Sequence, residues 1–208
     1  MAGRVVDLGV WNRADQFRFF RGFQRPHYAI TSRVDVTRLK AGRRAGLSPF
    51  RACVWAIGCG VHAVPELRMR FRGEVVTEYD RVELSMAVPL PDGNFNYAYV
   101  PWEPSFEGFD RVCRERIEAV RAGLPLAAND GSRDDLAYLS CLPWLDYTAL
   151  DNALPHAEDC IPRVSWGRFV EAEGRWSCAM TIQVHHALVD GRQVGDFFEA
   201  VRDALKMA

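Results

Sequence analysis

The sequence predicts one domain of mixed helices and strands, either of the α+β class or an α/β sandwich built on a mixed sheet. The chain has 208 residues, of which 49% are hydrophobic and 25% charged, as in a globular domain with a substantial core. Helical and strand-like periodicities are mixed, without the regular alternation that βαβ units require. No repeat or linker interrupts them, so we expect a single domain over residues 1–208.

The first third of the chain predicts a helix, a strand and a second helix. Residues 12–23 carry phenylalanines at helical spacing, and Asn12 can cap this helix. Residues 27–37 alternate as a strand does. Residues 48–64 are apolar on nearly every side, with Ser48 as the N-cap and a proline in the first turn. A helix this apolar belongs in the core.

The middle of the chain predicts two strand pairs and a helix. Residues 67–79 form two strands with a turn at Gly73, and residues 84–100 form two strands around the turn sequence Pro-Asp-Gly-Asn. Residues 105–124 return to helical spacing, and Gly123 ends that helix. Its apolar stripe consists of Phe106, Phe109, Cys113, Ile117 and Val120.

The last third predicts strands followed by a terminal helix. Residues 128–135 are a polar loop, and residues 136–144 are apolar and strand-like. Residues 163–186 predict two long strands joined near Gly174. Residues 194–207 form an amphipathic helix.

Charge and cysteine content exclude several classes of protein. With 26 basic and 27 acidic side chains the net charge is -1, which does not favour a nucleic-acid-binding protein. The cysteines contain no CxxC pair, so we expect reduced, mostly buried thiols and neither a disulfide framework nor a zinc site. They are Cys53, Cys59, Cys113, Cys141, Cys160 and Cys178. No signal peptide or membrane-spanning stretch is evident, so we expect a soluble cytoplasmic protein.

The run TIQVHHALVDG, from Thr181 to Gly191, is the strongest candidate for a functional site. Strand alternation places His186 at the end of an apolar row, where desolvation favours a neutral ring that can act as a base. Gly191 can provide a sharp turn into the last helix. Taken singly, His186 could equally be a structural core histidine, and Asp190 could be a helix N-cap.

A metal site fits the histidines poorly. Two adjacent histidines and an aspartate are a weak ligand set, and His27, His62 and His156 have no partner at ligand spacing. We therefore expect no metal.

Several segments, in order along the chain, resemble the chloramphenicol acetyltransferase family of CoA-dependent acyltransferases. The string HHxxxDG at residues 185–191 resembles that family's active-site signature. The other matching segments are VWNRADQF, YAITSRVDVT, PELRMR, SCLPW and IQVHHALVDGRQVGDFF. The resemblance extends from about Trp11 to Leu205, and it implies a two-layer sandwich in which helices flank a mixed sheet.

The resemblance implies a catalytic pair and a structural pair. His186 would be the general base that takes the proton of the acceptor hydroxyl, and Ser140 would donate a hydrogen bond to the tetrahedral oxyanion. Asp190 would pair with Arg13 of the first helix and hold the corner in shape. Cys141 is the only nucleophile nearby, and alternation points it to the face opposite Ser140, so direct transfer in a ternary complex is expected.

The acceptor pocket implied by the resemblance departs from the family in several places. It includes Phe20, Tyr28, Phe95, Tyr138 and Ser165. Phe20 and Tyr138 stand where the resistance enzymes usually carry a tyrosine and an asparagine, and Ser165 replaces a threonine. Small residues of the same wall are replaced by Pro26 and His27. Each lost hydrogen bond would weaken chloramphenicol binding by about 0.5–1.5 kcal/mol.

The resemblance further implies a homotrimer with its active sites at the subunit interfaces, and acetyl-CoA as co-substrate. The expected function is O-acetylation of chloramphenicol, which inactivates this antibiotic. The alternatives are an acetyltransferase for another alcohol or for a thiol, and a non-catalytic binder of a drug or CoA.

Overall fold

The structure is a computed structural model that describes residues 2–41 and 47–208. Its helices are α1 (Ala14–Arg21), α2 (Thr37–Ala41), α3 (Pro49–Ala63), α4 (Phe106–Arg121) and α5 (Gly191–Met207), with a short 3-10 helix, η1 (Pro65–Arg68). Its strands are β1 (Gly3–Val5), β2 (His27–Asp35), β3 (Met69–Arg72), β4 (Val75–Tyr79), β5 (Glu83–Pro89), β6 (Phe95–Pro101), β7 (Leu136–Leu142), β8 (Arg163–Gly167), β9 (Val170–Ala172) and β10 (Arg175–His185).

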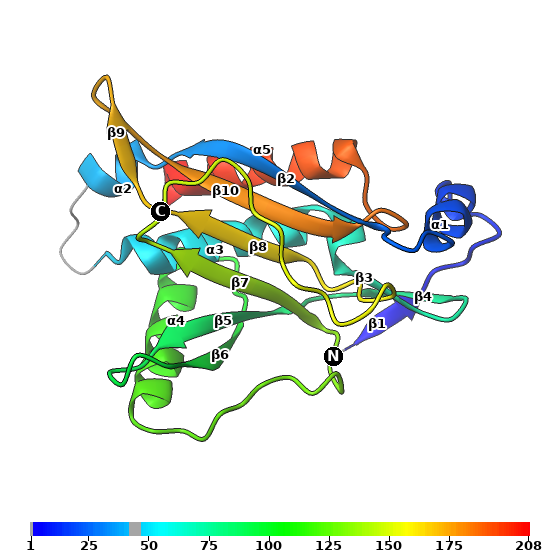
Figure 1. Ribbon diagram of the computed structural model, residues 1–208, viewed down its shortest axis with the longest axis horizontal. Coiled ribbons are helices and arrows are strands. Elements are labelled where there is room, and N and C mark those ends of the chain that lie inside the picture. Colours follow the sequence, from blue (N-terminus) through cyan, green and yellow to red (C-terminus); the bar gives the residue numbers. More distant parts are fainter. Residues whose placement is uncertain (1, 42–46) are drawn as a thin grey trace.

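A mixed sheet organises the molecule, in the order β2-β10-β8-β7-β5-β6 (Figure 1). β7 runs parallel to both β5 and β8, and the other neighbours on this path are antiparallel. β9 pairs with the first three residues of β10, Arg175 to Ser177. The predicted fold class, a mixed sheet with packed helices, is confirmed.

The helices α3, α4 and α5 pack on one face of this sheet, and no helix among the described residues covers the opposite face (Figure 1). α3 is central, as its apolar sequence predicts, and the Ser48 side chain caps it by accepting a hydrogen bond from the Arg51 N–H. α3 and α5 approach closely at Gly60. A Cβ atom there would lie 2.7 Å from side-chain carbons of Phe197 and Val201, so only glycine permits this packing distance.

A second, three-stranded sheet with the order β1-β4-β3 lies near α1 and was not predicted as a separate unit (Figure 1). Arg70 of β3 is 2% exposed and ties this sheet to the start of β7. Its guanidinium donates hydrogen bonds to the backbone carbonyls of Asp134, at 2.7 Å, and Leu136. The strand that carries Ser140 is therefore anchored at its N-terminal end.

The structure differs from the local predictions in three places. The N-cap of α1 is Arg13 instead of Asn12. The segment expected to be one long strand before Gly174 divides into β8 and β9, because the Arg168 N–H donates to the Leu145 carbonyl at 2.7 Å instead of continuing the ladder. Gly191 is the first residue of α5 and does not adopt the left-handed conformation.

Candidate active site

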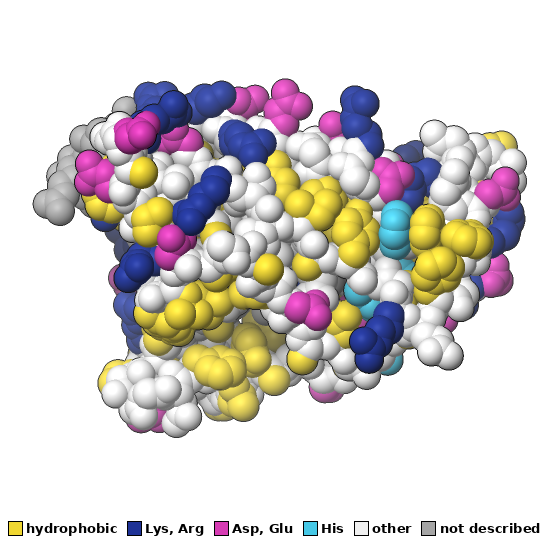
Figure 2. Space-filling view, turned by 45° about the horizontal axis from the view of Figure 1, so that its top comes forward, with side chains coloured by type: hydrophobic (Ala, Val, Ile, Leu, Met, Phe, Trp, Pro, Cys, Tyr) yellow, Lys and Arg dark blue, Asp and Glu magenta, His cyan; other side chains and the backbone are white. Residues whose placement is uncertain are grey.

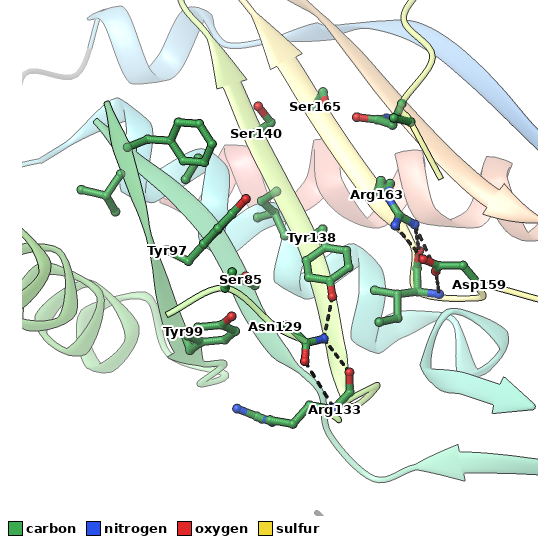
Figure 3. A pocket seen from close by; sticks show the side chains of 18 of the residues that line it. Ser85, Tyr97, Tyr99, Asn129, Arg133, Tyr138, Ser140, Asp159, Arg163 and Ser165 are labelled. Carbon is green, nitrogen blue, oxygen red and sulfur yellow. Dashed lines mark hydrogen bonds and ion pairs between the residues drawn. The ribbon is translucent and has the colours of Figure 1, made fainter. Parts of the chain in front are cut away.

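The helix-free face of the sheet carries a cavity of about 1380 Å³ over β5, β6, β7 and β8. Strand register arranges polar side chains on this face in two rows. One row contains Tyr99, Ser85, Tyr138 and Arg163, and the other contains Tyr97, Ser140 and Ser165 (Figure 3). Side chains two residues apart on a strand share a face, so both rows line the same cavity.

Ser140 and Ser165 are directly paired neighbours on β7 and β8. No hydrogen bond engages the Ser140 side chain within the described residues, so its hydroxyl is available as a donor. The next residue, Cys141, packs against the hydrophobic core, and burial raises the pKa of its thiol to about 12. A thiol that stays protonated at neutral pH is a poor nucleophile.

Tyr138 is held rigidly in the wall of the cavity. Its hydroxyl oxygen accepts a hydrogen bond from the Asn129 amide at 2.7 Å, and the Arg163 guanidinium lies 5.2 Å from the centre of its ring. Arg163 is fixed in turn by two hydrogen bonds to the Asp159 carboxylate, at 2.7 and 3.1 Å. Tyr138 therefore presents a fixed aromatic surface to the cavity, as Figure 3 shows.

The histidine corner lies at the far end of β10, next to α1. The strand ends at His185, and His186 begins the turn that leads to α5, so the predicted strand position of His186 was wrong by one residue. Asp190 is the N-cap of α5 and accepts a hydrogen bond from the Arg192 N–H at 3.0 Å. Its carboxylate also forms an ion pair with Arg13. Both interpretations of Asp190, helix cap and partner of Arg13, are therefore realised together.

The Arg13–Asp190 pair is unevenly buried. The Arg13 side chain is 9% exposed and that of Asp190 37%. Burial alone would raise the pKa of the Asp190 carboxyl, but the Arg192 N–H and the Arg13 guanidinium outweigh it and hold that pKa below its usual value. The Nε and Nη2 atoms of Arg13 are buried and have no hydrogen-bond partner among the described residues. Arg13 thus depends on Asp190 as its charge partner.

His185 is fully occupied by structural contacts. Its Nδ1 accepts a hydrogen bond from the Ala187 N–H and its Nε2 donates to the Ala157 carbonyl, both at 3.1 Å. Burial, with a smaller contribution from the neighbouring His27, lowers the pKa of His185 to about 4. His185 is therefore a neutral core histidine.

His186 is held by aromatic rings and retains an uncommitted ring nitrogen. The Phe20 ring stacks on the imidazole at 3.7 Å between centroids and an angle of 7°, and the Tyr28 ring lies at 4.7 Å. Its Nδ1 atom is buried without a partner among the described residues. Histidine and hydrophobic side chains meet at the surface at this end of the molecule (Figure 2). The ring is fixed without using its hydrogen-bonding capacity.

The histidine corner and the serine row are far apart within one chain. Ser140 pairs with Ser165 and Ser165 with Thr181, so Ser140 lies two strands away from β10 at the level of Thr181. His186 follows Thr181 by five residues. With about 4.8 Å between strands and about 3.3 Å per residue, Ser140 and His186 are roughly 19 Å apart. One chain cannot bring both side chains to the same reacting atom.

The remaining predicted pocket residues divide between these two places. Phe95 is 53% exposed at the rim of the cavity, and it lies on the same side as Tyr138 and Ser165. Pro26 and His27 lie at the histidine corner, where the Pro26 carbonyl accepts a hydrogen bond from the His186 N–H at 2.8 Å. The two clusters are brought together only if a second chain supplies one of them.

Sequence reasoning missed part of the cavity. Ser85, Asn129, Asp159 and Arg163 line it and were not singled out. Strand alternation over residues 84–100 could have placed Ser85 on one face with Tyr97 and Tyr99, because the turn fixes the pairing of β5 with β6. The positions of Asn129 and Asp159 follow from long connections, for which the local sequence holds no signal.

Within the described ranges, 2–41 and 47–208, no three histidine, cysteine or acidic side chains are grouped to hold a metal ion. In the same part of the chain, no helix has both the length and the apolar composition needed to cross a membrane.

Buried His185 and half-buried His62 should make the free energy of unfolding depend on pH. Burial lowers the pKa of His62 to about 4, as it does for His185. An unfolded histidine titrates near 6.5, so the unfolded chain binds more protons between pH 6.5 and 4. Stability present above pH 6.5 is therefore lost as the pH falls towards 4. Between pH 7 and 5 we expect a loss of about 2 kcal/mol for each histidine, measured by urea unfolding at fixed protein concentration.

The variant His62→Gln is the control for this pH dependence. Nδ1 of His62 donates to the Gly58 carbonyl at 2.8 Å and Nε2 accepts from the Val82 N–H at 3.3 Å, and a glutamine amide can also donate and accept. The variant should lose about half of the pH dependence. An unchanged slope would mean that His62 does not stay neutral in the folded protein.

The chain is similar to known proteins both in sequence and in fold. A family model described as chloramphenicol acetyltransferase matches residues 1–202. Chloramphenicol acetyltransferases from Bacillus pumilus and Streptomyces acrimycini are 24% and 26% identical, over 91% and 89% of this chain and 88% and 86% of theirs. A solved chloramphenicol acetyltransferase superposes with a TM-score of 0.86 at 25% identity, over 98% of this chain and all of that one. A dihydrolipoamide acetyltransferase from Azotobacter vinelandii shares the fold, with a TM-score of 0.69 and 18% identity over 92% of this chain and 86% of that one.

Proposed function

Because the chain belongs to the chloramphenicol acetyltransferase family and is therefore an acyltransferase, we propose that it transfers the acetyl group of acetyl-CoA to an alcohol hydroxyl, first of all that of chloramphenicol. The observation that carries the proposal is the difference between two adjacent histidines. His185 uses both ring nitrogens in structural hydrogen bonds, whereas His186 is held by ring stacking alone. A base must keep a nitrogen free for the proton it takes.

The proposed reaction uses His186 and Ser140. Nδ1 of His186 is buried, which leaves Nε2 as the nitrogen that a substrate can reach. Nε2 takes the hydroxyl proton as the acceptor oxygen attacks the thioester carbonyl, and the Ser140 hydroxyl donates a hydrogen bond to the resulting oxyanion. Collapse of the tetrahedral intermediate forms the acetyl ester and expels the CoA thiolate, which recovers the proton from the imidazolium. The half-buried Cys141 thiol, whose raised pKa keeps it protonated, argues against an acyl-enzyme.

We also propose that the active protein is a homotrimer with its sites between subunits. The separation of roughly 19 Å between His186 and Ser140 supports this, because a shared site requires the histidine corner of one chain to face the serine row of another. Phe20 and Tyr28 would come with His186, while Phe95, Tyr138 and Ser165 would come from the neighbour. We place the reaction in the cytoplasm, where acetyl-CoA is available.

An acetyl-CoA consumption assay with chloramphenicol and a panel of alcohols and thiols tests the proposal. If another alcohol or a thiol is acetylated and chloramphenicol is not, the proposed acetyl transfer stands and the proposed acceptor is wrong. Tight binding of CoA without turnover of any acceptor would instead indicate a non-catalytic binder.

Phe20→Tyr should lower the KM for chloramphenicol. The Phe20 ring stacks on His186 but offers no hydroxyl to the substrate. We therefore expect the wild-type protein to have a higher KM for chloramphenicol than an enzyme with tyrosine at this position. Its kcat should be preserved, because only ground-state contacts are missing. One restored hydrogen bond should lower KM by up to about tenfold, the equivalent of about 1.4 kcal/mol. Steady-state kinetics at saturating acetyl-CoA measure this.

Phe23→Tyr is the matched control, since Phe23 touches the Phe20 ring at 5.3 Å between centroids but does not contact His186. It should leave KM unchanged. A wild-type KM already in the low micromolar range would show that the missing hydroxyl is compensated elsewhere, and the specificity argument would then be withdrawn.

A further inference from the structure

One hydroxyl in the cavity has no partner. Ser85 of β5 is 2% exposed, and its Oγ makes no hydrogen bond with any described residue. Its side chain faces the cavity between Tyr99 and Tyr138 (Figure 3). The Tyr99 hydroxyl donates to the Ala127 carbonyl at 2.6 Å, so its proton is not available to Ser85. A buried hydroxyl without a partner costs free energy, so a group that enters the cavity and bonds to Ser85 gains the corresponding interaction.

A second available hydroxyl lies on the next strand. Tyr138 is the register partner of Ser85 across β5 and β7. Its phenol oxygen accepts from Asn129 at 2.7 Å, and the phenol proton has no acceptor among the described residues. Ser85 and Tyr138 therefore each keep an O–H group that a ligand in the cavity can use.

The charges around this pair favour an uncharged ligand group. Arg163 is compensated by Asp159, with hydrogen bonds of 2.7 and 3.1 Å. Arg133 is compensated by Asp135 at 2.9 Å and by Glu83 at 3.0 Å. Because neither guanidinium is left as a net positive charge, a carboxylate or phosphate would lose its hydration without gaining an ion pair. A neutral hydroxyl, amide or carbonyl does not carry this cost.

Strand geometry sets the backbone spacing between this pair and Ser140. Tyr138 precedes Ser140 by two residues on β7. We propose that Ser85 and Tyr138 form a second acceptor-binding subsite, which takes an uncharged hydrogen-bonding group and whose backbone lies about 7 Å along β7 from that of Ser140. The inference rests on the proposed acetyl transfer at Ser140, and it defines the acceptor class: alcohols that carry a second, neutral polar group.

The test uses the full-length protein and two probes of matched shape, 4-hydroxybenzyl alcohol and 4-methylbenzyl alcohol. Wild-type protein should prefer the hydroxyl probe in kcat/KM by about tenfold, as one well-formed hydrogen bond gives. Ser85→Ala should reduce this preference at least about threefold, and Tyr138→Phe should act in the same direction. The anionic probe 4-(hydroxymethyl)benzoate should be accepted less well than the hydroxyl probe.

Ser177→Ala is the control, since Ser177 of β10 lies outside the cavity, and it should keep the wild-type preference. Calorimetric binding of 4-hydroxybenzyl alcohol in the presence of CoA gives a second readout that needs no turnover. Equal affinity of wild type and Ser85→Ala would overturn the subsite, as would an unchanged kcat/KM ratio with acetylation intact. If no alcohol is acetylated but Ser85→Ala weakens binding, the subsite stands and the proposed reaction fails.

Discussion

Replacing His186 with alanine should lower kcat for acetyl transfer by about 10³- to 10⁴-fold while CoA binding and oligomeric state are retained. The Phe20 ring stacks on the imidazole, the Tyr28 ring packs against it at an angle of 50°, and the imidazole makes no side-chain hydrogen bond within the described residues. Its removal therefore takes away the proposed proton acceptor and few structural contacts. The rate constant, CoA affinity and mass in solution are measured on the same preparation.

The neighbouring residue provides the matched control. His185→Ala removes a side chain that is 2% exposed and makes two hydrogen bonds, so it should lower the free energy of unfolding more than the His186 variant does. Residual activity per folded molecule should remain well above that of His186→Ala. An inactive His185 variant beside an active His186 variant would show that the roles of the two histidines are reversed.

Mixed assemblies test whether the two proposed catalytic groups, His186 and Ser140, come from different chains. His186→Ala and Ser140→Ala should each be nearly inactive alone. In trimers assembled from equal amounts of both, about a quarter of the interfaces should pair an intact histidine with an intact serine. Activity should recover to that fraction after co-refolding. No recovery, with mixed trimers demonstrated by mass, would mean that histidine and serine act from the same chain.

The sequence contained the local signals of the fold but not its long-range contacts. The capped helix α3 and the strand pair β5–β6 follow from Ser48 and the Pro-Asp-Gly-Asn turn, and both predictions were confirmed. The break between β8 and β9 depends on the Leu145 carbonyl, which meets the Arg168 N–H across a loop. Helix and strand periodicities reflect neighbours along the chain, so they cannot reveal a contact between residues that are far apart in the sequence.

The candidate site shows the same limit. The motif around His186 could be located because a turn and a helix cap leave Asp190 and Gly191 at fixed offsets. The unpartnered hydroxyl of Ser85 is a property of the folded cavity, because it depends on which side chains of β6 and β7 lie beside it. Composition and spacing contain no information about an absent hydrogen bond.

The Arg13–Asp190 pair should show strong coupling in a double-mutant cycle. Asp190→Asn keeps a side chain that caps α5 but leaves the buried Arg13 cation without its partner, and Arg13→Ala removes the cation. Because Asp190 is 37% exposed, solvent screening reduces the cost below that of a fully buried pair. We expect each variant to lose about 1–3 kcal/mol of unfolding free energy, with a corresponding loss of activity, since the pair joins Arg13 to the N-cap of α5, directly after the turn that carries His186.

The double variant should cost less than the sum of the single variants by about 1 kcal/mol, because once Arg13 is gone the Asp190→Asn substitution leaves no buried cation unpaired. Urea unfolding at one protein concentration measures all four proteins. The exposed pair Arg192–Asp196 is the control, and the same cycle there should give a coupling of about 0.3–0.5 kcal/mol. If the Arg13–Asp190 coupling is no larger than this, the pair does not hold the histidine corner, and the turn must be stabilised by the α5 capping box alone.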